Sequence, residues 1–252
     1  MIETRGLWMA VLAGAGVLSA GCKASDDTGA VTSRSGGTTS EAPAADAVEE
    51  RDMALVRVVN AVPGAEVTIW AGDSSAFQGV AFKKATEYQE IPDDRFNFSI
   101  RAAGPESEAL AENRENLDDG GHYTIVALPA QDDPADRNLR VLNDDHKPVD
   151  PDKARVRFIN GVPGDNDVDL FLRGREDAIF DGVNFATEAG WNEIEPGSGT
   201  LTVRPDGKNT ALASLPNVSL EGGKSYTFVL AGKASNPELI RIVDDVAKDP
   251  TD

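Results

Sequence analysis

The residues of this chain with the spacing of a metal-binding loop lie between Asp165 and Glu176. Asp165, Asp167 and Asp169 stand at alternate positions, and Glu176 falls at the twelfth position counted from Asp165. Oxygen ligands at these spacings, with a bidentate Glu at the end, bind Ca²⁺ in EF-hand loops. Such a loop also needs Gly at its sixth position, where this chain has Leu170 inside a segment typical of a strand. We therefore expect a polar turn leading into a strand, with Asp165, Asp167 and Asp169 as candidate metal ligands in the alternative interpretation.

Catalytic chemistry has few other residues to use. The chain has two His, His122 and His146, and one Cys, Cys22, so it lacks the ligands for a Cys or Cys/His zinc cluster and the pair needed for a disulfide. No Gly-x-Ser-x-Gly motif is present to position a nucleophile beside either His. The 43 acidic residues always allow a carboxylate pair for sugar hydrolysis, and for that reason they single out none. We expect surface His residues, no cofactor and no enzymatic activity; a glycan hydrolase is the alternative.

The chain is acidic along its whole length. It has 24 basic and 43 acidic side chains and a formal net charge of −19, which repels phosphate backbones and argues against nucleic-acid binding. We expect paired acids between strands to form turns and to keep the surface soluble, with weak calcium sites as the alternative. These pairs are Asp93-Asp94, Asp118-Asp119, Asp132-Asp133, Asp144-Asp145 and Asp244-Asp245.

Residues 1–21 have the organisation of an export signal. Arg5 precedes an apolar run from Leu7 to Leu18, which lies within the roughly 7–15 residues of a signal-peptide core and is too short to span a bilayer. Small residues then lead to Cys22, the single cysteine of the chain.

The sequence Leu-Ser-Ala-Gly-Cys that ends at Cys22 resembles the lipobox of bacterial lipoproteins. The resemblance implies that diacylglycerol alkylates the Cys22 thiol and that residues 1–21, a lipoprotein signal peptide, are removed. Each buried methylene of an acyl chain contributes about 0.8 kcal/mol, so two or three chains hold a protein stably on a membrane. Lys23 stands where an Asp favours retention in the inner membrane of enterobacteria, so by analogy the outer membrane is favoured. Ordinary secretion with an incidental Cys is the alternative.

Residues 22–52 are expected to form a disordered, flexible tether. They are rich in Ser, Thr, Gly, Ala and acidic residues and lack apolar periodicity. Such a segment cannot bury enough surface to offset its ordering entropy. A coil of this length reaches on the order of 30 Å, enough to hold a folded body away from a lipid surface.

The remainder of the chain contains an internal duplication. Three pairs of segments match in one order, with spacings of 100 to 103 residues: Val56–Gly64 with Val156–Gly164, Gly79–Phe82 with Gly182–Phe185, and Asp118–Thr124 with Glu221–Thr227. We therefore interpret residues 53–150 and 151–252 as two copies of one domain.

Each copy has the pattern of an all-β, antiparallel sandwich of the Ig-like kind. Short alternating or β-branched segments are separated by Gly, Pro, Asp and Asn at intervals of roughly 8–12 residues. The expected strands are 54–60, 66–71, 76–82, 86–91, 95–101, 108–112, 122–129 and 138–143, then 154–160, 167–173, 178–185, 188–194, 199–204, 211–215, 224–232 and 238–243.

Several aromatic residues invite a carbohydrate-stacking interpretation. They occupy equivalent positions in the two copies, however, which favours packing in the core or at corners. The equivalent pairs are Tyr88 with Trp191, Tyr123 with Tyr226, and Trp70 with Phe171.

The segments VRVVNAVPG, VRFINGVPGDNDVDLFL and GGKSYTFVLAG resemble the family known as domain of unknown function 4397 (DUF4397), and the resemblance covers about residues 54–246. Members commonly carry tandem copies in exported bacterial proteins. The resemblance implies a sandwich fold and an envelope location, and it implies no activity. Asn60 and Asn160 stand where the family pattern has His.

Together these features predict a non-enzymatic lipoprotein of the cell envelope that displays two β-sandwich modules. Its partners would be the lipid bilayer, through acylated Cys22, and an envelope protein or polysaccharide bound by loops at the sandwich ends. Two sites on one tether gain avidity through effective concentration. A calcium-stabilised surface adhesion or carbohydrate-binding module is the alternative.

Overall fold

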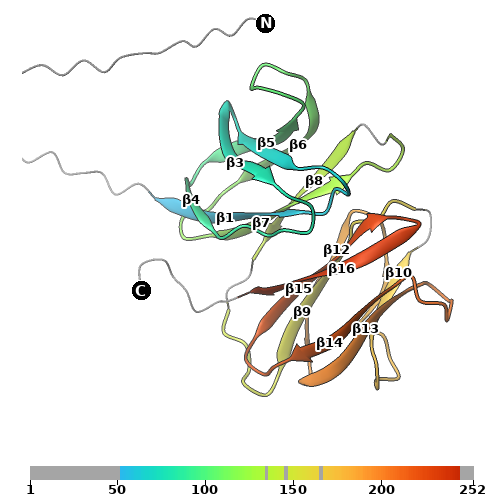
Figure 1. Ribbon diagram of the computed structural model, residues 1–252. Coiled ribbons are helices and arrows are strands. Elements are labelled where there is room, and N and C mark those ends of the chain that lie inside the picture. The colour runs from blue at the N-terminus through green and yellow to red at the C-terminus, as the bar shows by residue number, and fades with distance from the viewer. Residues whose placement is uncertain (1–51, 134–135, 145–146, 165–166, 245–252) are drawn as a thin grey trace, which may run out of the picture. The chain divides into compact units, whose positions relative to one another are not determined.

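The computed structural model describes residues 52–244, except 134–135, 145–146 and 165–166 (Figure 1). The proposed signal peptide, Cys22 and nearly all of the tether therefore lie outside the described residues, as do Asp165 and His146. The part that is described has sixteen strands and no helix, which confirms the all-β prediction. Accordingly, it has no helix of the length and apolar character needed to cross a membrane.

Eight strands form each copy. The first copy consists of β1 (Met53–Asn60), β2 (Val67–Ala71), β3 (Ser74–Val80), β4 (Gln89–Pro92), β5 (Arg95–Arg101), β6 (Ala109–Asn116), β7 (His122–Pro129) and β8 (Arg137–Asn143). The second copy consists of β9 (Ala154–Asn160), β10 (Val168–Leu172), β11 (Phe180–Val183), β12 (Thr187–Ile194), β13 (Gly197–Pro205), β14 (Ala213–Leu220), β15 (Ser225–Lys233) and β16 (Asn236–Asp244).

The two copies have the same topology. The sheets of the first copy have the orders β4-β1-β7-β8 and β3-β2-β5-β6, and those of the second have β12-β9-β15-β16 and β11-β10-β13-β14. Strand for strand, each position in one order corresponds to the same position in the other, so the internal duplication is visible in the fold.

Each copy has one parallel strand pair, which corrects the expectation of wholly antiparallel sandwiches. β1 runs parallel to β7, and β9 runs parallel to β15. The chain between these strands crosses to the opposite sheet and back twice before it returns beside the first strand. A tight hairpin therefore does not fix the direction of the pair. All other strand pairs in the described sheets are antiparallel.

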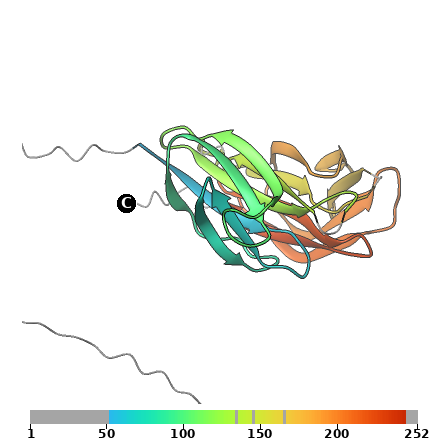
Figure 2. The ribbon, with the colours of Figure 1, turned by 90° about the horizontal axis from the view of Figure 1, so that it is seen from above.

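The two sheets of each copy face each other around a core of their own (Figure 2). In the first copy Val56 and Ile125 of one sheet share a core with Ile69 and Phe98 of the other. In the second copy Phe158 and Phe228 pack with Leu170 and Leu201 in the same way. Alternate residues of the strands point inward, as a half-buried sheet requires.

The strands β1, β7, β9 and β15 are buried on both faces. Their inner faces belong to the two sandwich cores, while their outer faces join in a third apolar cluster that contains Val59 and Val126 of the first copy and Ile159 and Val229 of the second. This double burial explains why their sequences are nearly continuous apolar runs. The described parts of the two copies accordingly belong to one compact unit.

Candidate functional site

Two arginines lie at equivalent places in the first strand of each copy. Arg57 lies in β1 and Arg157 at the equivalent place in β9, and their exposed fractions are 5% and 0%. A buried guanidinium must be paired and hydrogen-bonded, because desolvation of an unpaired charge is very costly. Both arginines meet this requirement through the other copy.

The two copies exchange acidic partners. Arg57 Nη2 pairs with Asp244 Oδ1 at the end of β16, and Arg157 Nη2 pairs with Asp144 Oδ1 directly after β8. Asp144 and Asp244 are 4% and 5% exposed. Each ion pair therefore joins the first strand of one copy to the last strand of the other, and the two pairs are equivalent by the internal duplication.

Two threonines complete this arrangement, which we call the inter-copy polar cluster: Arg57, Thr124, Asp144, Arg157, Thr227 and Asp244. Thr124 Oγ1 accepts from Arg57 Nε at 2.8 Å and donates to Asp144 Oδ2 at 2.6 Å. Thr227 Oγ1 accepts from Arg157 Nε at 2.8 Å and donates to Asp244 Oδ2 at 2.7 Å. Each carboxylate thus receives a hydroxyl from its own copy and a guanidinium from the other.

Aromatic rings cover both guanidinium groups. The Arg57 guanidinium lies 4.7 Å from the centre of the Tyr88 ring, and that of Arg157 lies 4.4 Å from the centre of the Trp191 ring. The Tyr88 hydroxyl also donates to Asp144 Oδ2 at 2.7 Å. The equivalent aromatic residues predicted to pack do so here against buried cations, a favourable arrangement when the cation is desolvated.

The surroundings of the cluster shift the pKa values of Arg57 and Tyr88 upward. Burial by itself lowers the pKa of Arg57, but the combined attraction of Asp244 and its other neighbours outweighs burial, so the net shift is upward. Burial raises the pKa of the Tyr88 hydroxyl, and Asp144 raises it further. Tyr88 therefore remains a hydrogen-bond donor to Asp144 across the neutral pH range.

The burial of Asp144 and Asp244 corrects the expectation that these acids lie in solvent-exposed turns. They follow or end the last strand of each copy, where the opposite copy covers them. One sequence feature pointed to this arrangement: a charged residue interrupts an apolar strand at the same place in both copies, Arg57 and Arg157. The exchange of partners between copies has no signature in either copy taken by itself.

The Asn residues that replace the family His hold the loops that follow β1 and β9. Asn60 Nδ2 donates to the carbonyl oxygens of Ala65 and Val80 at 2.8 and 2.7 Å, and its Oδ1 accepts from the Val62 amide at 2.8 Å. Asn160 donates to Val183 O at 3.1 Å and accepts from the Val162 amide at 3.2 Å. Both side chains are buried, so their role is to satisfy backbone groups.

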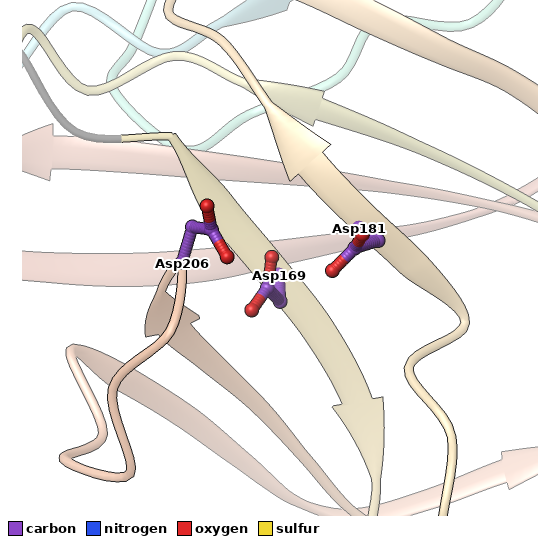
Figure 3. Close-up of side chains that lie close together, drawn as sticks. All are labelled: Asp169, Asp181 and Asp206. Atoms are coloured by element: carbon purple, nitrogen blue, oxygen red, sulfur yellow. The ribbon is translucent and has the colours of Figure 1, made fainter.

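Of the two candidate metal ligands that the structure describes, Asp167 and Asp169, one lies in a group of acids. Asp169 of β10 comes together with Asp181 of β11 and Asp206, which follows β13, and one carboxylate oxygen of each lies within 4.8 Å of the others (Figure 3). Asp169 is buried, while Asp181 and Asp206 are exposed. The backbone carbonyl of Asp167 accepts a hydrogen bond from the Asp206 amide, and the Asp167 carboxylate is not part of this acidic trio.

The acidic trio differs from the loop that the sequence suggested. Its members come from three separate segments, because adjacent strands place Asp181 beside Asp169 although they are distant in sequence. Asp169 also has a structural role, since its Oδ1 accepts from the Gly182 amide at 2.9 Å. Thr68 takes that role in the first copy by accepting from the Gly79 amide at 3.4 Å. The chemistry available to the trio is oxygen ligation of a hard cation.

The other predicted residues have structural contacts. Tyr123 and Tyr226 lie in the two cores, and their hydroxyls accept from the amides of Asp118 and Glu221, both at 2.9 Å. The packing expected for this equivalent pair is confirmed. His122 is half-buried and meets the Tyr88 ring edge to face, with 5.5 Å between ring centres.

Comparison with known proteins gives one result. A family model described as "Domain of unknown function (DUF4397)" matches the chain twice, over residues 54–171 and 154–252. No curated protein matches the chain. The double match agrees with the repeated topology of the two copies.

Proposed function

Because the chain belongs to the DUF4397 family, with two copies of its fold, we propose that it is a lipid-anchored protein of the cell envelope with a binding or structural role and no catalytic activity. Acylation of Cys22 would attach it to the bilayer, and residues 22–52 would act as the tether. Lys23 after the lipidated Cys favours the outer membrane. The partner would be an envelope protein or polysaccharide.

The inter-copy polar cluster is the observation that carries this proposal. Buried ionisable residues in a cleft often mark catalytic sites. Here the buried charges of Arg57, Arg157, Asp144 and Asp244 form ion pairs with one another, and these pairs join the two copies. Such a use favours a rigid scaffold that presents its outer surfaces and loops to a partner.

Metabolic labelling tests the anchor. Labelled palmitate is expected to enter the wild-type chain, and Cys22→Ala is expected to abolish incorporation. Label that persists in Cys22→Ala would contradict the assignment of Cys22. Fractionation of the labelled cells then tests the outer membrane against the inner membrane.

Cross-linking in intact cells tests the binding role. We expect the anchored protein to retain an envelope protein or polysaccharide, and a variant with the inter-copy cluster disrupted, Asp144→Asn with Asp244→Asn, to retain less of it. A wild-type chain that retains no envelope partner would count against a binding role.

A calcium-stabilised surface module is the second candidate, favoured by the acidic trio of Asp169, Asp181 and Asp206. A cation that binds the folded state alone raises stability by mass action. The melting temperature would then rise in millimolar calcium relative to chelator, and Asp181→Asn would remove the rise, while Asp73→Asn, an exposed acid of the first copy, would not. An unchanged melting temperature in the wild-type chain excludes this candidate.

A further inference from the structure

The second copy has an open hollow on the outer side of β10 and β13. It has a volume of about 440 Å³, and its lining includes Phe171, Arg173, Arg175, Thr202, Arg204 and Ser214. Three guanidinium groups around one hollow are unusual for a chain with a net charge of −19. Glu176 is the acidic residue that also lines it.

Arg204 is the central cation of this hollow. Its guanidinium lies 4.5 Å from the centre of the Phe171 ring, a cation–π contact. Its Nε is covered and has no hydrogen-bond partner in the part of the chain that the structure describes. Buried donors without a partner are rare in folded proteins. A ligand would meet this guanidinium at its terminal nitrogens.

The first copy satisfies the equivalent arginine with its own residues. Arg101 Nε donates to Ser99 Oγ at 3.0 Å, and its Nη1 donates to the carbonyl oxygens of Pro105 and Ser107 at 2.7 and 2.9 Å. Strand register makes Arg204 the counterpart of Arg101, because Ile69 pairs with Ile100 as Leu170 pairs with Val203. The second copy has the same cation, and among the residues that the structure describes no loop carbonyl accepts from it.

The second copy has also gained cations beside Arg204. Two residues connect β2 to β3, whereas seven connect β10 to β11, and Arg173 and Arg175 lie in that longer connection. Arg175 Nη2 donates to Glu195 O, which holds its side chain at the rim. Asp169 is opposite Arg204 in register, and its Oδ1 accepts from the Gly182 amide.

The lining of the hollow also has three hydroxyl groups and one aromatic ring, beside Leu172 and Gly174. Thr202 and Ser214 are cross-strand partners, and Thr200 lies two residues before Thr202 on β13, on the same face of the sheet. Hydroxyl groups and one ring suit a ligand with many hydroxyls of its own, while guanidinium groups recognise carboxylate and phosphate through paired hydrogen bonds.

We propose that this hollow binds an acidic sugar chain, with a carboxylate or phosphate group held by Arg204, Arg173 and Arg175. The inference deepens the proposed binding function and rests on it. In this proposal the second copy recognises the sugar, and the first copy is the scaffold that holds the second copy in place.

Calorimetric titration of the full-length chain in detergent tests the proposal. The probes are oligogalacturonate for the carboxylate source, a phosphorylated mannose oligomer for the phosphate source, a neutral glucose oligomer and a polyglutamate peptide. We expect one or both acidic sugars to bind, with affinity that falls as salt rises, and the neutral oligomer not to bind. Arg204→Gln should weaken binding by about tenfold or more, since it removes a charge-assisted contact.

Two further variants keep the test decisive. Arg173→Gln with Arg175→Gln lies in an exposed connection and should weaken binding even if Arg204→Gln folds poorly. Arg140→Gln removes the same charge from an exposed site on β8 and should leave binding unchanged.

Absence of binding by both acidic sugars would overturn the proposal. So would the same affinity for the acidic sugar in Arg204→Gln, in Arg173→Gln with Arg175→Gln, and in the control Arg140→Gln. Equal binding of polyglutamate would overturn the assignment to a sugar. None of these results bears on palmitate labelling or on the retention of an envelope protein in cells, so failure of this site is distinguishable from failure of the proposed function.

Discussion

Arg57, in the first strand of the first copy, forms a buried ion pair with Asp244, which ends the last strand of the second copy. The duplication supplies the same pair in reverse, Arg157 with Asp144. Each copy thus carries both partners of a self-complementary contact, and the two copies meet through it as the subunits of an isologous dimer do.

Removal of one acid from the inter-copy polar cluster should be strongly destabilising. Asp244→Asn removes the acid that pairs with Arg57 Nη2 and leaves Asp144 Oδ2, 3.9 Å from Arg57 Nε, as the remaining acid of the cluster beside this buried guanidinium. We expect the loss to lower the free energy of unfolding by about 3–5 kcal/mol. Urea denaturation measures the change. Glu193→Gln, an exposed acid on β12, is the control and should alter stability by less than about 0.5 kcal/mol. A loss for Asp244→Asn as small as that of the control would show that the pair contributes little.

The two equivalent asparagines should differ in importance. Asn60→Ala removes three hydrogen bonds to backbone groups, at Val62, Ala65 and Val80, whereas Asn160→Ala removes two, at Val162 and Val183. Each unmet buried group costs about 1–3 kcal/mol. We therefore expect the larger loss of unfolding free energy for Asn60→Ala, and the opposite order would contradict this account of the two loops.

Close packing between the copies should make Gly161 intolerant of a methyl group. A Cβ there would lie 2.6 Å from Leu230 O and 2.7 Å from Leu128 Cδ2, and Leu128 belongs to the first copy. We expect Gly161→Ala to cost about 1–3 kcal/mol by overpacking. Gly164→Ala is the matched control, because nothing lies within 4 Å of its added Cβ. Thermal denaturation that ranks the two variants equally would argue against tight apposition at this point.

Ionisation of Tyr88 should lower the free energy of unfolding at alkaline pH. Burial and Asp144 raise the pKa of its hydroxyl in the folded state. The folded state then holds this proton more tightly, so its contribution is complete below the ordinary tyrosine pKa of about 10 and is lost as pH rises above it. Tyr88→Phe should be less stable at pH 7 by about 1–2 kcal/mol, through the lost hydrogen bond to a charged group. The deficit should narrow between about pH 10 and 11, and a constant deficit would contradict the shift.

The sequence predicted the fold class and the duplication because both depend on local patterns. Turn residues at regular intervals indicate short strands. In the second copy β12, Thr187–Ile194, differs from the expected strand by a single residue. The expectation failed for the parallel pairs, since strand direction depends on how the chain returns to a sheet after it has crossed to the other one.

The functional sites were harder to predict because their members converge from distant segments. Asp169 was a candidate, but Asp181 and Asp206 join it only through the neighbours of β10 in the sheet. The expected role of Asp144 failed for a similar reason: a pair of acids after a strand is typical of an exposed turn, and only the opposite copy buries this one. The arginine hollow likewise depends on a difference between copies, Arg204 against Arg101, that becomes visible once hydrogen-bond partners are known.

Scanning calorimetry of the full-length chain tests most directly whether the reciprocal ion pairs make one body of the two copies. The wild-type chain should unfold in a single transition, with equal calorimetric and van't Hoff enthalpies for both copies together. Asp144→Asn with Asp244→Asn should lower the transition temperature and separate the unfolding of the copies. Two independent transitions in the wild-type chain, unaffected in spacing by the double substitution, would contradict the account.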